Sequence, residues 1–266
     1  MSTTKQVAKK EEGLPAYMTQ DKGMGTEDIS MDDIVIPRLK ICQPLSEVKQ
    51  ANKAMKDGSF YDSVSADELG ESVNVYILLK WNSVIWFDNQ KLIATQYTDA
   101  ETKKVETIGI PPDGVKGISC FNYMVVLSSD LQSAIKSGVA PKILIYSASS
   151  AAQKSARKLN GILQSNGNKG VSIFANRITI GSEVVKFDKG SAFMPVFSTK
   201  KYASKLEYVA LKELHIACKK MQSHESAHAE TEETTIAADT IVNNNGTVVG
   251  QTGKPNSEDP FATEEE

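Results

Sequence analysis

The sequence is poor in cysteine. Its three cysteines, Cys42, Cys120 and Cys218, are odd in number and far apart, and no C-x-x-C pair occurs. This argues against a disulfide framework and a cysteine zinc site, and it suits a reducing cytoplasm. The chain also has no apolar run approaching the ~18 residues of a membrane span, and it begins without the apolar segment of a secretion signal. We therefore expect a protein of the cytoplasm with no membrane partner.

Histidine is equally scarce, with three residues that all lie at position 215 or later. An active site that uses histidine as its base is therefore not expected in the preceding part of the chain. Phosphate-loop and serine-hydrolase motifs are missing too, since the chain has neither G-K-[ST] nor G-x-S-x-G. We accordingly expect no catalytic residue, no cofactor and no enzymatic activity.

One string does match a catalytic motif, because His224-Glu225-Ser226-Ala227-His228 reads H-E-x-x-H. On a buried helix two such histidines would bind zinc, and the glutamate would act as a base. The segment that carries the string here lacks an apolar face, and it offers neither a third ligand nor a partner to orient the imidazoles. We expect a chance match and no metal site.

Charge is divided unevenly along the chain. Residues 34–222 carry 25 Lys and Arg against 16 Asp and Glu, a net charge of +9. Residues 223–266 carry one basic residue, Lys254, against ten acidic ones, and residues 1–33 carry four basic against seven acidic. A basic body favours a polyanion through counterion release. A flexible acidic tail can compete for the same groove and can also present a docking peptide.

Three segments follow from these patterns: a flexible N-terminal arm over residues 1–33, a core over 34–222 and a disordered acidic tail over 223–266. The core predicts a β-rich α+β fold, for which an OB-type barrel with one or two helices is the first choice and a generic α+β sandwich the alternative. Helical spacing occurs over 149–164 and 205–221. Strands are expected at 34–41, 73–81, 83–87, 91–97, 117–127, 142–146, 171–180, 183–187 and 192–197. The first is an edge segment, because Pro37 cannot donate to a ladder.

Rings and cations on shared strand faces are the main candidates for binding nucleic acid. In the strand at 73–81, Tyr76 and Lys80 lie on the face opposite the alternating aliphatic row. Trp86 joins that face unless a turn at Asn82-Ser83 resets the pattern. Phe121 and Tyr123 share a face of their strand; core packing is the stronger interpretation for Phe121, and Tyr123 is kept as a candidate.

Further candidates come from basic segments. Phe197-Ser-Thr-Lys-Lys-Tyr202 combines two rings with two cations in an expected linker before the last helix. No acid occurs between Ser147 and Ser182, a stretch that includes the polar face of the first helix. The complete set of candidate contacts is Tyr76, Lys80, Trp86, Tyr123, Lys154, Arg157, Lys158, Arg177, Lys200, Lys201 and Tyr202.

The order of these parts resembles the single-stranded DNA-binding proteins of lytic tailed bacteriophages. The resemblance lies in a short arm leading into Ile34-Val-Ile-Pro-Arg-Leu-Lys-Ile41, a strand containing Trp-Asn-Ser-Val-Ile-Trp-Phe, a terminal helix and an acidic tail. It implies an OB-type core, sequence-tolerant binding of single-stranded DNA, and a role in phage replication, recombination and repair. It also implies a tail that recruits partners, namely replication or recombination proteins or host RNA polymerase, through Glu258, Asp259, Phe261, Glu264, Glu265 and Glu266. The tail departs from the bacterial pattern, in which a phenylalanine is the last residue.

Two other functions stay open at this point. One is a phage adaptor or transcription-associated protein that binds host RNA polymerase through its tail. The other is a metal-dependent nuclease or peptidase. Tight binding to oligo-dT supports DNA binding, binding to a polymerase alone supports the adaptor, and metal-dependent turnover supports the enzyme.

Overall fold

A computed structural model describes residues 35–88, 91–187, 190–228, 241–242 and 248–249, all within one compact unit. The predicted arm therefore lies outside the described residues, as do nine of the ten acidic residues of the tail; the tenth, Glu225, stands in a helix whose backbone is described. Within the described part, no helix combines the length and the apolar character needed to cross a membrane.

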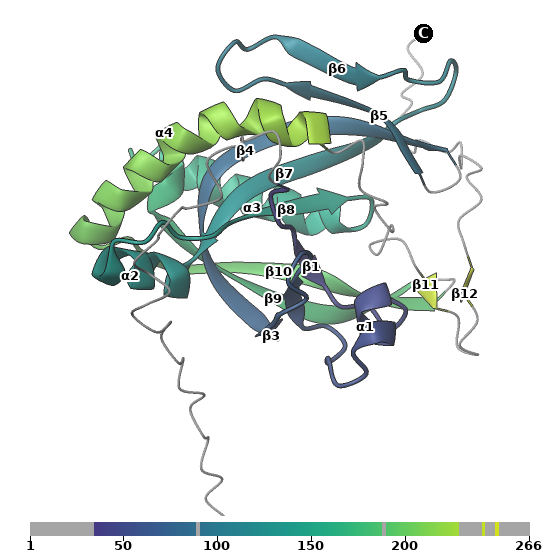
Figure 1. Ribbon diagram of the computed structural model, residues 1–266, viewed down its shortest axis with the longest axis horizontal. Helices are drawn as coiled ribbons and strands as arrows, with labels where there is room; N and C mark the ends of the chain where they lie inside the picture. Colours follow the sequence, from purple (N-terminus) through teal and green to yellow (C-terminus); the bar gives the residue numbers. More distant parts are fainter. Residues whose placement is uncertain (1–34, 89–90, 188–189, 229–240, 243–247, 250–266) are drawn as a thin grey trace, which may run out of the picture. The chain divides into compact units, whose positions relative to one another are not determined.

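Strand β4 (Ser72–Asp88) organises the main sheet, and Figure 1 shows it as a long curved ribbon. One edge of β4 pairs with β7 (Ile118–Leu127), which in turn pairs with β8 (Ile143–Ser149). The other edge is divided between two partners. Its first half pairs with β9 (Asn176–Phe187) and its last part with β5 (Lys91–Thr98).

The two branches end in different strands. β10 (Gly190–Tyr202) follows β9 and is continued by β11 (Ile241–Val242) and β12 (Val248–Val249), and β6 (Val105–Gly109) follows β5. All of these pairings are antiparallel, and they do not close into a barrel. The β-rich α+β class is thus confirmed, whereas the OB-type barrel stays a prediction.

A small second sheet precedes β4. It contains β1 (Leu39–Ile41), β2 (Phe60–Asp62) and β3 (Glu68–Gly70), with the short helix α1 (Glu47–Ala51) between β1 and β2. Just before β1, the Pro37 carbonyl accepts a hydrogen bond from the Ile145 amide, so this segment lies along the free edge of β8. The expectation of an edge segment is confirmed.

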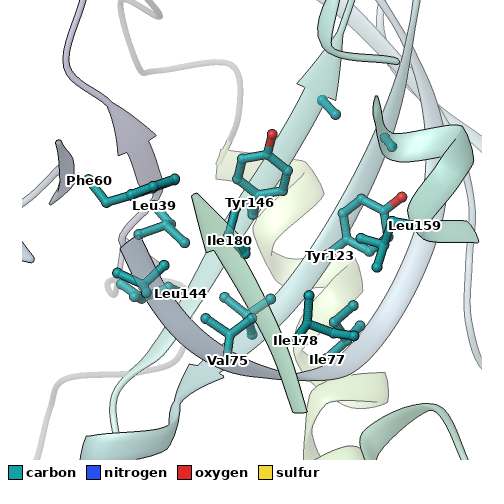
Figure 2. Close-up of a cluster of buried hydrophobic side chains, with 14 of the residues drawn as sticks. Leu39, Phe60, Val75, Ile77, Tyr123, Leu144, Tyr146, Leu159, Ile178 and Ile180 are labelled. Atoms are coloured by element: carbon teal, nitrogen blue, oxygen red, sulfur yellow. The ribbon is translucent and has the colours of Figure 1, made fainter. Parts of the chain in front are cut away.

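Helix α3 (Ala152–Gly167) covers one face of the main sheet. It packs against β7, β8 and β10, and its Ala152, Ala156 and Leu159 enter a core with aliphatic residues of β4 and β9. Figure 2 shows Leu159 among these residues, together with Tyr123 and Tyr146. The predicted helix at 149–164 is confirmed, with both of its ends shifted by three residues.

Helix α4 (Lys205–His228) and helix α2 (Ser128–Ser137) cover the opposite face, with a single 3-10 turn at Ile173–Ala175 (Figure 1). α4 begins at a capping box, because the Ser204 hydroxyl accepts from the Glu207 amide and the Glu207 carboxylate accepts from the Ser204 amide. The predicted helix at 205–221 is confirmed and runs on to His228. α2 was not predicted.

A β-bulge at Leu78 exchanges the faces of β4. Ile77 is paired with Val125, but Leu79 is paired with Met124, so one extra residue stands in β4. The carbonyl of Leu78 accepts a hydrogen bond from Nδ1 of His215 in α4 at 2.6 Å. Because side chains alternate along a strand, the extra residue moves every later side chain to the other face.

The predicted pairing of Tyr76 with Lys80 on one face is therefore wrong. Tyr76 lies on the face covered by α4, whereas Lys80 is paired with Tyr123 and lies on the face covered by α3. β4 also continues through Asn82 and Ser83 without a turn. Trp86 consequently shares a face with Lys80, as the unbroken strand predicted.

Candidate nucleic-acid interface

Two of the predicted ring contacts are buried. Tyr76 is 1% exposed beneath α4, and burial together with the nearby Glu207 carboxylate raises its pKa to about 12. Tyr123 is 0% exposed, stacks on Tyr146 and donates a hydrogen bond to Asn160 of α3. Neither ring has a free face on which a base can stack. We therefore remove both from the candidate interface.

Lys80 forms the centre of an accessible cluster on the α3 side of the sheet. Its ammonium lies 5.2 Å from the ring centroid of Phe121 and donates to Asn82 Oδ1 at 2.6 Å. Partial burial lowers the pKa of Lys80 below its ordinary value, because desolvation disfavours the charged form. Phe121 is half-buried and Asn82 is exposed. A cation, an amide and a ring thus meet at one point of the surface.

Trp86 extends this cluster along the same strand. Its indole Nε1 donates to the Val115 carbonyl at 3.0 Å, which holds the ring against the loop between β6 and β7. A Cβ added at Gly117 would lie 2.6 Å from Trp86 Cε2, so glycine at that position allows the close approach. The indole stays half-exposed.

Helix α3 brings its basic residues beside this row. Gln153 donates to the Ser119 carbonyl, and Asn160 accepts from Tyr123, so this side of the helix turns toward β7. Arg157 lies four residues after Gln153 and three before Asn160, and positions at this spacing share one side of a helix. Lys154 and Lys158 lie farther outward, and all three cations are exposed.

We call this surface the β4–α3 face and define it by Lys80, Asn82, Trp86, Phe121, Lys154, Arg157 and Lys158. Strands β4, β7 and β8 and helix α3 contain one acidic residue, Asp88 at the end of β4. The face therefore combines rings with a net positive charge; the cations can attract phosphates and the rings can contact bases.

The remaining candidates lie elsewhere. Phe197–Tyr202 is part of β10 and not a linker, so the expectation for this segment is corrected. Arg177 and Lys201 are partners in the β9–β10 ladder, whereas Tyr202 is paired with Asn176, which is hydrogen-bonded to Asn166 of α3. A bulge lies between Thr199 and Lys201, so the side chains of these two residues lie on opposite faces of the sheet. Phe197 itself contacts Tyr146 in the core.

Arg177 and Lys201 consequently lie on the α4 side of the sheet, away from the β4–α3 face. Tyr202 is 57% exposed near the end of α3. The side chain of Lys200 lies outside the described residues.

The H-E-x-x-H string falls on the last turns of α4. The side chains of His224, Glu225 and His228 are not among those described, so the absence of a metal site there stays a prediction. The tail candidates from Glu258 to Glu266 lie beyond the described residues as well.

Asn82 and Phe121 were not proposed as contacts from the sequence. Asn82 stood at an expected turn, and Phe121 resembled an ordinary core residue. The bulge at Leu78 moves Asn82 to the face that Phe121 already shares with Tyr123 on β7. The period-two pattern of 73–81 conceals this bulge because Leu78 and Leu79 are both apolar. The one sequence feature that indicates the bulge is the adjacent apolar pair Leu78 and Leu79, which interrupts strict alternation.

Comparison with known proteins yields one match. No curated protein and no solved structure matches the chain. A family model described as Pam3 phage gp34-like protein matches residues 8–224, which include strands β1 to β10 and most of α4. The match covers well over half of the sequence and indicates a bacteriophage protein. The chain belongs to the Pam3 phage gp34-like protein family.

Proposed function

We propose that this phage protein binds single-stranded DNA through the β4–α3 face, without catalysis, and acts in phage DNA replication, recombination and repair. The observation that carries the proposal is the Lys80 ammonium beside the half-exposed Phe121 ring, next to an acid-free basic helix. Single strands are held by rings that contact bases and by cations that follow the phosphates. The face offers both within one row of side chains.

The spacing of side chains along β4 also supports contact with successive bases. A strand rises ~3.4 Å per residue, so Lys80 and Asn82 lie about 7 Å apart along β4, and Trp86 lies about twice that distance beyond Asn82. Arg157 lies beside this row, and Lys154 and Lys158 lie farther outward on the same helix. In the proposed complex the bases contact β4 and the phosphates contact α3. The site of action would be the cytoplasm of the bacterial host.

Tryptophan fluorescence tests the proposal directly. Trp86 lies half-exposed on the β4–α3 face, whereas Trp81 is 6% exposed on the α4 side. Titration with oligo-dT should quench fluorescence; the quench should be lost in Trp86→Phe and kept in Trp81→Phe. Absence of binding in filter and fluorescence titrations of the folded full chain, at low salt, would reject the function. Loss of the quench in Trp81→Phe alone would place the site on the other face.

The acidic tail supplies a second test. Ending the chain after His228 preserves α4, deletes the two-residue strands β11 and β12 beside β10, and removes nine acidic residues and one lysine. We expect tighter binding to oligo-dT at low salt, because a tethered polyanion competes at an effective concentration on the order of millimolar. The gain should shrink as added salt shortens the Debye length toward ~3 Å.

Recruitment is the second role proposed for the tail. Capture of replication or recombination proteins, or of host RNA polymerase, should be lost on the same truncation. Weaker DNA binding by the shortened chain would contradict competition and make the tail part of the site. An unchanged affinity at every salt concentration would contradict it too.

A further inference from the structure

Asn82 is held in one orientation by Lys80. An ammonium can only donate, so the amide atom 2.6 Å from Lys80 Nζ is the oxygen, and this contact fixes which end of the amide points where. The amide NH2 group, with its two donors, is then left for a ligand. Asn82 is exposed and stands directly opposite Phe121 in the β4–β7 ladder, so this group lies at the surface beside the ring.

This orientation changes which base the asparagine can recognise. A free asparagine pairs with adenine by accepting from N6 and donating to N7. Here the accepting oxygen is engaged by Lys80, and a base amino group approaching it would meet the N–H groups of an ammonium. One lone pair of Oδ1 is taken by Lys80 and the other lies beside the positive charge of the ammonium, so the Asn82–Lys80 pair presents mainly donors to a base. Donors match the carbonyl oxygens O4 of thymine and O6 of guanine, and they oppose the exocyclic amines of cytosine and adenine.

From this contact we infer that the β4–α3 face prefers bases with a carbonyl group at this edge, and that Asn82 sets the preference. The inference rests on the proposed function, since it concerns the same site. It adds a base-specific contact to a surface whose remaining cations contact phosphates alike in every sequence. Trp86 lies about 13 Å farther along β4, so the contact concerns one base and the preference is limited to one position in the bound strand.

The pyrimidine pair gives the cleanest test, because thymine and cytosine differ in the group at this edge while keeping the ring size. Oligo-dT and oligo-dC of equal length are titrated by fluorescence anisotropy against the full chain, at a pH at which cytosine is uncharged. The parent should bind oligo-dT about threefold to tenfold more tightly, the value of one hydrogen bond. Asn82→Ser should bring the ratio toward unity.

Asn82→Asp makes the sharper prediction. A carboxylate accepts from cytosine N4, so the ratio should reverse in favour of oligo-dC even though both affinities fall. Asn168→Asp, an equal charge change at an exposed residue after α3, should keep the parental ratio. A parental ratio retained in both Asn82 variants would overturn the inference while leaving DNA binding intact. Failure of the parent to bind either strand would instead reject the proposed function.

Discussion

Replacing Lys154, Arg157 and Lys158 together by alanine should weaken binding to oligo-dT by about 50-fold at 0.15 M salt, with a larger loss at lower salt. All three cations are exposed; Arg157 lies on the side of α3 that borders the Lys80 row, and Lys154 and Lys158 lie farther outward. Each phosphate contact with a single strand contributes about 0.7 to the slope of log K against log salt. Losing three contacts should therefore flatten the slope by about 2, which titrations at several salt concentrations measure.

A matched control separates local contact from net charge. Three other exposed lysines lie outside the β4–α3 face: Lys53 in the loop after α1, Lys136 on α2 and Lys186 on β9. Alanine at these three positions removes the same charge and should change the slope little. If both triple variants lost affinity for oligo-dT equally, binding would depend on overall charge and not on the β4–α3 face.

The second large effect concerns stability. Tyr123→Ala should lower the free energy of unfolding by about 3–5 kcal/mol, because it empties a fully buried site between α3 and the sheet. Tyr123→Phe removes the hydrogen bond to Asn160 and keeps the ring, so it should cost about 0.5–1.5 kcal/mol. Urea unfolding followed by circular dichroism measures both.

Phe121 provides the contrast, because it lies two residues before Tyr123 on the same face. Phe121→Leu keeps apolar packing but removes the ring beside Lys80. The free energy of oligo-dT binding should therefore change more than the free energy of unfolding. Tyr123→Phe should leave binding unchanged. If Tyr123→Phe weakened binding while stability stayed at the parental value, the hydroxyl would have to reach the DNA, and the assignment of Tyr123 to the core would be wrong.

Local patterns predicted most of the secondary structure. Alternation over 73–81 predicted a strand, and apolar spacing predicted both long helices, because side-chain periods of two and 3.6 follow from backbone geometry alone. The expected half-burial of that strand was wrong, since α3 and α4 cover its two faces. The strand expected at 171–180 begins only at Asn176, after a 3-10 turn. α2 was missed because its ten residues include four serines and few apolar positions, so no stripe is visible.

The β-rich core, its long helices and the separation of a basic body from an acidic end can be read from the amino-acid sequence, since each is a property of neighbouring residues. Which side chains are available to a ligand depends instead on long-range packing. The extra residue at Leu78 moved Lys80, Asn82 and Trp86 to the α3 side, and helix α4 buried Tyr76 on the other side. A one-residue bulge is almost invisible in an apolar strand, yet it reverses every later side chain, and covering by a helix depends on contacts between residues more than a hundred positions apart.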